Sequence, residues 1–333
     1  MDDEYSIMEY LIIIVPDKDT GSSLILPETL EAPHLHHLML VGLALPIGCR
    51  LLTTAAGLVT LCLFMVHPST YFYPNTLLQW LSFMPQLESL MVAFLSPVPN
   101  RDIERQLTLP PIMATITLPN LHRFVFFGVT TYLEGLIHRI ATPRLEELEI
   151  WFFNQLTFSL PCLAQFVNAA ENLVFKSAKF KFSDKEVEVD VYPHEEAEMY
   201  ALSITVFCLH LDWQVSSAAQ IFNSLSPAFS AVEHLTFEHE IHGQSSQEHN
   251  EADPTEWREL LSSFRNVKTL RIAEGLVEEL SFCLQLDHGE NSSELLPELQ
   301  VLTYPESGDT GDTFTSFVDI RQSAGRPITL IRS

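Results

Sequence analysis

A six-residue apolar pattern returns along the whole length of this chain and leaves few folds open to it. The pattern has an apolar residue, two variable residues, a second apolar residue, one variable residue and a third apolar residue. Eleven copies begin at Met8, Leu35, Leu58, Leu87, Leu121, Leu145, Ala170, Val206, Val232, Val267 and Leu299. Neighbouring copies start 23 to 36 residues apart. A pattern that returns so often in 333 residues predicts an array of similar units stacked on one another.

Each copy predicts a short strand. The last two apolar residues are two positions apart, so their side chains point to the same face of a strand, and the variable residues point to the other face. Between the copies, apolar residues fall at helical spacing. We therefore expect short amphipathic helices at 76–84, 132–140, 162–170, 217–225 and 256–264.

This alternation of strands and helices predicts an α/β fold, specifically a leucine-rich-repeat solenoid or horseshoe. Right-handed crossovers place the parallel strands on the concave face and the helices on the convex face. We expect a single irregular array over residues 1–333 with about eleven repeats. Three segments depart from the repeat: a hairpin-like insertion near 180–192, a polar loop at 244–253 and a C-terminal cap at 314–333.

The charge of the chain excludes some partners. Its formal net charge is −25, and such a surface repels the phosphates of nucleic acids and anionic membranes. The acid is uneven, with 15 acidic and 7 basic residues in 1–166 but 28 acidic and 11 basic residues in 167–333. Acid of this kind keeps a Leu-rich protein in solution, and a basic partner for the second half is the alternative.

Cysteines and hydrophobic segments indicate the compartment. The five cysteines are odd in number and contain no CxxC pair, so we expect neither disulfides nor a zinc site, and a cytoplasmic or nuclear protein. The start, Met1-Asp2-Asp3-Glu4, is acidic where a signal peptide is basic. The apolar stretch from Leu51 to Val66 has 16 residues, shorter than the roughly 20 that a membrane-spanning helix needs.

No motif in the sequence predicts catalysis. The run His239-Glu240-Ile241-His242 has its histidines three apart, whereas a zinc-protease helix needs them four apart. The paired carboxylates Glu146 and Glu147 alternate between the two sides of a predicted strand, and there is no GxSxG elbow. We therefore expect a protein that is not an enzyme and that has no cofactor, no metal and no catalytic residue.

The outward positions of the predicted strands give candidates for partner binding. Phe127 and Trp151 lie on adjacent strands and are the expected aromatic anchors, with Arg123 beside them. The remaining candidates are Glu147, Glu149, His210 and Asp212. The alternative is that Trp151 and Phe152 share the core and that the register is off by one residue, which would turn every side chain to the other face.

The chain resembles the leucine-rich-repeat region of basidiomycete fungal F-box proteins. The resemblance covers essentially the whole chain and is carried by the segments Leu26–Leu35, Thr142–Leu148, Phe229–Leu235 and Gly325–Ile328. It implies a substrate receptor of a cullin ubiquitin ligase, whose F-box docks a Skp-type adaptor.

The F-box itself is missing from these residues. Leu26-Pro27-Glu28-Thr29-Leu30 is superficially similar to its first segment but sits between two repeats. The chain therefore looks like an N-terminally truncated member, and the adaptor is an expected partner only where an F-box lies upstream. The resemblance leaves the repeat surface as a binding site for a protein partner whose identity the sequence does not give.

Three functions stay open. The first is a protein–protein interaction module that acts as a receptor in ubiquitination. The second is a truncated structural remnant that binds nothing strongly. The third is a hydrolase with an unrecognised site, which would require a deep pocket with converging polar groups.

Overall fold

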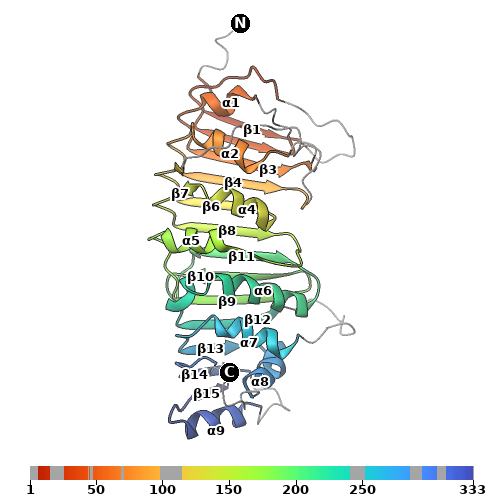
Figure 1. Cartoon of the computed structure of the whole chain (residues 1–333), viewed down its shortest axis with the longest axis vertical. Helices are drawn as coiled ribbons and strands as arrows, with labels where there is room; N and C mark the ends of the chain where they lie inside the picture. Colours follow the sequence, from red (N-terminus) through yellow and green to blue (C-terminus); the bar gives the residue numbers. More distant parts are fainter. Residues whose placement is uncertain are drawn as a thin grey trace. The chain divides into compact units, whose positions relative to one another are not determined.

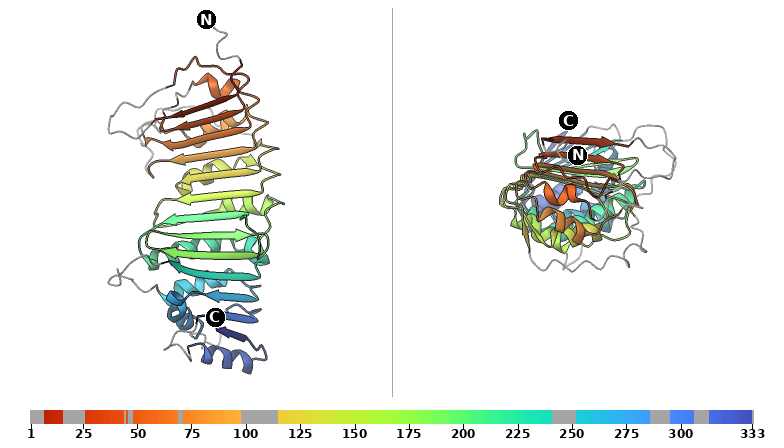
Figure 2. Two further views of the ribbon diagram at one scale, coloured as in Figure 1. Left: turned by 180° about the vertical axis from the view of Figure 1, so that it is seen from behind. Right: turned by 90° about the horizontal axis from the view of Figure 1, so that it is seen from above.

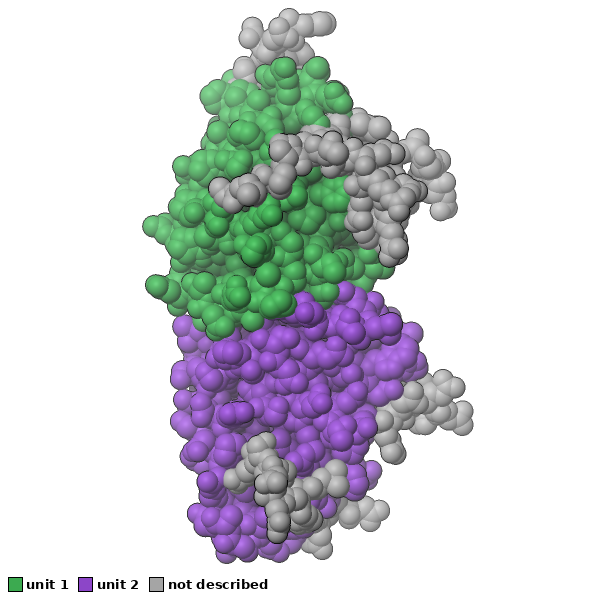
Figure 3. All heavy atoms as spheres, viewed as in Figure 1, with its two compact units in different colours: residues 1–153, 161–173 green, residues 154–160, 174–333 purple. Residues whose placement is uncertain are grey.

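A computed structural model of the chain shows an α/β protein of mostly parallel strands and short helices (Figure 1). It describes residues 7–15, 26–43, 45, 48–68, 71–97, 115–240, 252–285, 295–305 and 313–332. Contacts divide the chain into two compact units (Figure 3). Unit 1 comprises residues 1–153 and 161–173, and unit 2 comprises residues 154–160 and 174–333.

Unit 1 contains a parallel sheet in which strands that follow one another along the chain also lie side by side. The strands in order are β1 (Tyr10–Ile14), β2 (His37–Val41), β3 (Thr60–Val66), β4 (Ser89–Phe94), β6 (Arg123–Gly128) and β8 (Glu147–Phe152). The helices are α1 (Arg50–Thr54), α2 (Pro74–Leu81), α4 (Thr130–Ile137) and α5 (Pro161–Ala169). Two short strands, β5 (Ile116–Thr117) and β7 (Ile140–Ala141), pair separately.

Unit 2 contains a mixed sheet with the order β11-β10-β9-β12-β13-β14-β15. The strands are β9 (Ser177–Ser183), β10 (Glu186–Tyr192), β11 (Leu202–Phe207), β12 (His234–Glu240), β13 (Thr269–Ile272), β14 (Val301–Tyr304) and β15 (Thr329–Arg332). The helices are α6 (Leu211–Leu225), α7 (Pro254–Ser262), α8 (Val277–Gln285) and α9 (Thr315–Ser323), with 3-10 turns η2 (Ala228–Ala231) and η3 (Glu274–Leu276). β10 pairs antiparallel with both β9 and β11, and the pairs from β9 through β12 to β15 are parallel.

A backbone hydrogen-bond motif repeats at the start of the strands. Two successive amides of one strand donate to a single carbonyl of the strand before it: those of His122 and Arg123 to Glu88, and those of Glu146 and Glu147 to His122. The same arrangement joins Lys268 and Thr269 to Glu233 in unit 2. The same pair of hydrogen bonds therefore fixes the register between these neighbouring strands each time.

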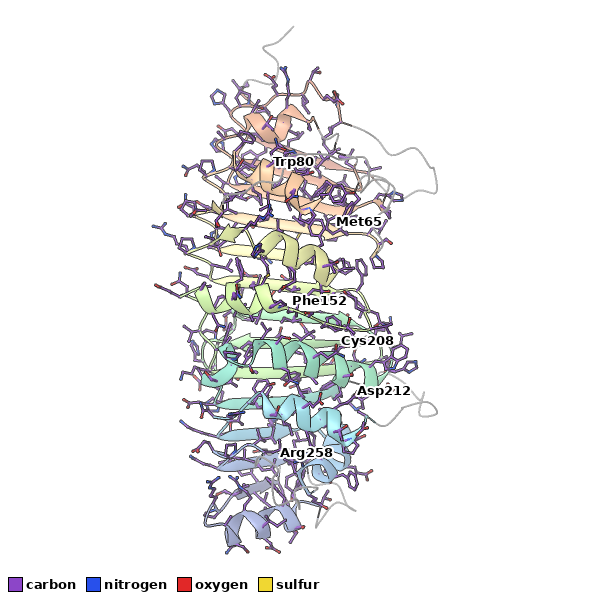
Figure 4. All side chains as sticks on the ribbon, viewed as in Figure 1. Met65, Trp80, Phe152, Cys208, Asp212 and Arg258 are labelled. Atoms are coloured by element: carbon purple, nitrogen blue, oxygen red, sulfur yellow. The ribbon has the colours of Figure 1, made fainter. Side chains whose placement is uncertain are left out.

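The repeated apolar residues form the core. In most copies the first apolar residue is buried just before the strand begins, as Leu87, Leu121 and Leu145 are. The other two point towards the helices, and Leu148 and Ile150 have no exposed surface. Helix α2 covers this face with Trp80, of which 1% is exposed (Figure 4). The α/β class and the core residues of these copies are confirmed, and the five predicted helices are present, each starting one to six residues earlier than predicted.

Two copies of the pattern are misplaced. The Ala170 copy predicts a strand near 172–175, but the chain there forms a turn in which the Leu173 amide donates to the Ala170 carbonyl, and β9 begins at Ser177. In the Val206 copy, β11 ends at Phe207 and helix α6 begins at Leu211. Leu209, expected in the core, is 69% exposed.

The three segments expected to depart from the repeat fare differently. An antiparallel hairpin of β9 and β10 occupies the residues where the alternation predicts one. Helix α9 and strand β15 lie within the expected cap. The polar loop at 244–253 lies outside the described residues except for Ala252 and Asp253.

None of the described helices is long and apolar enough to cross a membrane, and the Leu51–Val66 stretch contains most of α1 together with β3.

Candidate functional site

The helices of unit 1 cover one face of its sheet and leave the other face without helices (Figure 2). We call this second face the open face. Its side chains form rows across the strands, because the parallel register places one residue of each strand next to the corresponding residue of its neighbour. One row is polar and comprises His37, Thr60, Ser89, Arg123 and Glu147. The next row is apolar until β8 and comprises Met39, Cys62, Met91, Val125 and Glu149.

The burial pattern of strand β8 shows which of its side chains face outward. Its burial alternates strictly: Leu148, Ile150 and Phe152 are fully buried, whereas Glu147, Glu149 and Trp151 are partly exposed. The predicted register is therefore correct for this strand. Five of the seven candidate residues, Arg123, Phe127, Glu147, Glu149 and Trp151, lie together on β6 and β8.

An ion-paired cluster links the two strands. The Arg123 Nε donates to Glu147 Oε1 at 2.8 Å, and its terminal nitrogen lies 3.3 Å from Glu149 Oε2. The Trp151 indole Nε1 donates to Glu149 Oε1 at 2.7 Å. The carboxylates are 15–18% exposed and the Arg123 side chain is 40% exposed. Glu149 therefore holds both the guanidinium and the indole in place, which lowers the entropy that a partner must remove on binding.

Aromatic rings continue this cluster along the same strands. The Phe127 ring lies 6.2 Å from the Trp151 ring and 4.4 Å from the Phe153 ring, measured between centroids. All three side chains are partly exposed. The arrangement is a group of rigid aromatic side chains beside an oriented arginine, and these residue types are enriched among the residues that carry binding energy at protein interfaces.

The prediction for His210 and Asp212 is wrong. They were expected at outward positions of a strand, but His210 caps the start of helix α6 and Asp212 lies in its first turn. The Asp212 carboxylate accepts a hydrogen bond from the Trp213 amide at 2.9 Å. Figure 4 places Asp212 near Cys208, the residue that follows the end of β11. Both residues belong to unit 2, whereas the Arg123 cluster belongs to unit 1.

The corresponding face of the sheet in unit 2 is ionic. Lys181 of β9 bonds to Asp190 at 2.6 Å and to Glu188 at 3.0 Å, both on β10. Lys179 of β9 pairs with Glu238 of β12 at 2.8 Å. Burial works against the charge of Lys181, but its hydrogen bonds to the two carboxylates raise the pKa of Lys181 well above its ordinary value. The sequence analysis assigned this segment to a hairpin-like insertion and named no candidate binding residue in it.

A cysteine, a histidine and a glutamate meet at the start of helix α5. Cys162 Sγ lies 3.8 Å from His138 Nδ1, beside a mostly apolar pocket of about 430 Å³. However, burial and the neighbouring Glu134 raise the pKa of Cys162, whereas a nucleophilic thiol needs a lowered pKa. The amides of Cys162 and Leu163 both donate to Glu134 at 2.8 Å, so they are not available to an oxyanion. The group caps a helix and does not activate a thiol.

We expect a thiol reagent at pH 8 to modify one of the five cysteines in the folded protein. Cys162 is partly exposed and the other four are buried. Burial raises the pKa of Cys208 and of Cys283 to about 12, so both stay protonated at this pH. Titration with Ellman's reagent before and after unfolding should count one thiol and then five, with Cys162→Ser reducing the first count to zero. Rapid reaction of two or more thiols in the folded protein would contradict this burial.

Metal binding and similarity to known proteins give no further residues. Among the described residues no group of three or more His, Cys, Asp or Glu side chains is placed to hold a metal ion. In the run His239–His242, His239 and Glu240 end strand β12, while Ile241 and His242 lie outside the described residues. No protein-family model matches the chain, and comparison with curated proteins finds no match.

Proposed function

We propose that this chain is a non-enzymatic protein–protein interaction module built as a leucine-rich-repeat solenoid, and that the open face of unit 1 binds the partner. The repeated hydrogen bonds from two amides to one carbonyl support the repeat architecture. The observation that carries the binding proposal is the cluster of Phe127, Trp151 and Arg123, which is partly exposed yet held in place by Glu147 and Glu149.

The resemblance to fungal F-box proteins extends this proposal. In that setting the open face would select a substrate for ubiquitination, and a Skp-type adaptor would bind only where an F-box precedes these residues. The cluster itself carries two carboxylates and one guanidinium, so a partner with complementary basic groups around an apolar centre fits it best.

The test compares variants of the full chain in affinity capture, followed by direct binding to the purified partner. Trp151→Ala should weaken that binding by about 30-fold, as expected for an anchor worth about 2 kcal/mol. Phe83→Ala is the matched control, because Phe83 is an exposed aromatic residue that follows helix α2 in the same unit. Equal recovery of every bound protein by all three forms would contradict the proposal and favour a remnant without a strong partner.

A further inference from the structure

A second surface feature lies wholly within unit 2, on the helix side of its sheet. It is a pocket of about 530 Å³ formed where the segment 154–156 meets the N-terminal parts of helices α6 and α7. Its lining residues come from three separate parts of the sequence and are Asn154, Gln155, Leu156, Asp212, Trp213, Ser216, Ser217, Gln220, Asp253 and Glu256. The volume suits one amino-acid side chain or a small ligand.

The lining is acidic beyond what the helices need. Asp212, Asp253 and Glu256 each lie at or next to a helix start, where a carboxylate offsets a helix dipole of about half a positive charge. Two helix starts thus offset about one of the three negative charges, which leaves roughly two in excess. The described residues that line the pocket include no Lys or Arg. Burial raises the pKa of Glu256; a hydrogen bond with Ser216 opposes this, and the nearby carboxylates of Asp253 and Asp212 add to it.

Two of the carboxylates keep an oxygen for a ligand. Asp253 uses Oδ1 for the amide and the hydroxyl of Thr255, at 2.8 and 2.7 Å. Asp212 uses Oδ1 for the Trp213 amide. In each case the second oxygen makes no hydrogen bond within the part of the chain that the structure describes. These oxygens can accept bonds from a cationic donor without breaking the helix caps.

Apolar and polar neighbours of these carboxylates narrow the ligand further. Trp213 is 51% exposed and Leu156 is 95% exposed, and both line the pocket. Ser217 also lines it, is 95% buried and has no hydrogen-bond partner among the described residues. An indole face beside carboxylates recognises a cation that also has a flat or apolar surface, and a guanidinium on its alkyl stem has both properties.

We propose that this pocket binds the arginine side chain of a basic protein segment, with the guanidinium between the carboxylates and Trp213. The alkyl stem packs against Leu156, and the free oxygens of Asp212 and Asp253 accept N–H bonds. This site is distinct from the open face of unit 1 and does not depend on the function proposed for that face. Under this proposal, part of the excess negative charge in the second half of the chain serves to bind an arginine side chain.

The test uses acetyl-Gly-Arg-Gly-amide and its citrulline analogue as probes, titrated into the full chain and followed by ligand-observed NMR. Citrulline has nearly the same shape without the charge. We expect the arginine peptide to bind at least about 10-fold more tightly than the citrulline peptide. Equal binding of the two peptides, or no binding of the arginine peptide, would overturn the proposal.

Matched charge variants separate this pocket from general attraction to an acidic protein. Glu256→Gln removes one lining carboxylate, whereas Glu259→Gln makes the same change on an exposed residue of the same helix that does not line the pocket. We expect Glu256→Gln and Trp213→Ala each to weaken binding by about 5-fold, and Glu259→Gln by less than about 2-fold. Equal losses in Glu256→Gln and Glu259→Gln would show non-specific attraction and refute the site.

Discussion

Phe152→Ala is expected to lower the free energy of unfolding of unit 1 by about 3–5 kcal/mol, because it removes a large side chain from a filled core. Phe152 ends strand β8 and has no exposed surface (Figure 4). The stability of a whole domain is about 5–15 kcal/mol, so the loss is a large part of it. Urea denaturation followed by tryptophan fluorescence measures the change, with buried Trp80 as a reporter in the same unit.

The control for this variant is the adjacent residue in the sequence. Trp151 lies on the opposite face of the same strand and is partly exposed. Trp151→Ala should cost about 1 kcal/mol of stability, while it removes the anchor proposed for the partner. Phe152→Ala therefore affects mainly folding, whereas Trp151→Ala affects mainly binding. A loss of stability in Trp151→Ala as large as that in Phe152→Ala would show that the strand register is wrong.

The sequence predicts β8 well because its first four residues alternate between carboxylates and apolar side chains, and this alternation sets the face of Trp151 and Phe152 as well. Leu148, Ile150 and Phe152 can be buried together only on one face, and Glu147 and Glu149 exclude the opposite register, since it would bury two carboxylates. The same reasoning places Arg123 and Phe127 on the open face. Periodicity thus determines both the core and the five clustered candidate residues without any knowledge of tertiary contacts.

The apolar pattern predicts a strand wrongly where its apolar residues belong to two different elements. Val206 and Leu211 both fit it, but Val206 belongs to the end of β11 and Leu211 to the start of α6, so His210 and Asp212 were misplaced. The antiparallel hairpin of β9 and β10 explains the departure, because it replaces the usual crossover helix with a tight turn at Asp184 and Lys185. Short apolar runs do not distinguish these cases.

The sequence could not predict the acidic pocket, and the reason differs from that for His210 and Asp212. Its lining residues are separated by up to about a hundred positions, and their proximity follows from the packing of α6 against α7. The uneven charge of the two halves was the only signal, and it gives a sign but no location. Sites of this kind become visible only when the helix starts are placed in space.

The second large effect is expected for Lys181→Met, which should lower the free energy of unfolding by about 2–4 kcal/mol. Lys181 is the ion-pair partner of Asp190, whose side chain is 4% exposed. Removing the ammonium leaves that carboxylate buried, and among the described residues the Tyr192 hydroxyl, at 3.3 Å, is then its one remaining hydrogen-bond donor. An uncompensated buried charge costs more than the pair itself contributes. We place the effect below that of a fully buried pair because Lys181 is 25% exposed.

Lys179→Met is the matched control for this variant. It lies two residues earlier on β9, points to the same face and makes the same change in charge. The two side chains of this pair are 32% and 35% exposed, so solvent screens the pair and its loss should cost at most about 1 kcal/mol. Similar losses in the two variants would mean that burial of Asp190 does not determine the effect.

The difference in unfolding free energy between wild type and Lys181→Met depends on pH through the raised pKa of Lys181. A lysine whose pKa is higher in the folded than in the unfolded chain stabilises the fold fully below its unfolded value, near 10.5. The contribution is lost as the pH rises through the folded value. The difference between wild type and Lys181→Met should therefore stay constant from about pH 6 to 9 and narrow only in stronger base. A gap that closes between these two pH values would show that the ammonium of Lys181 is not what stabilises the hairpin.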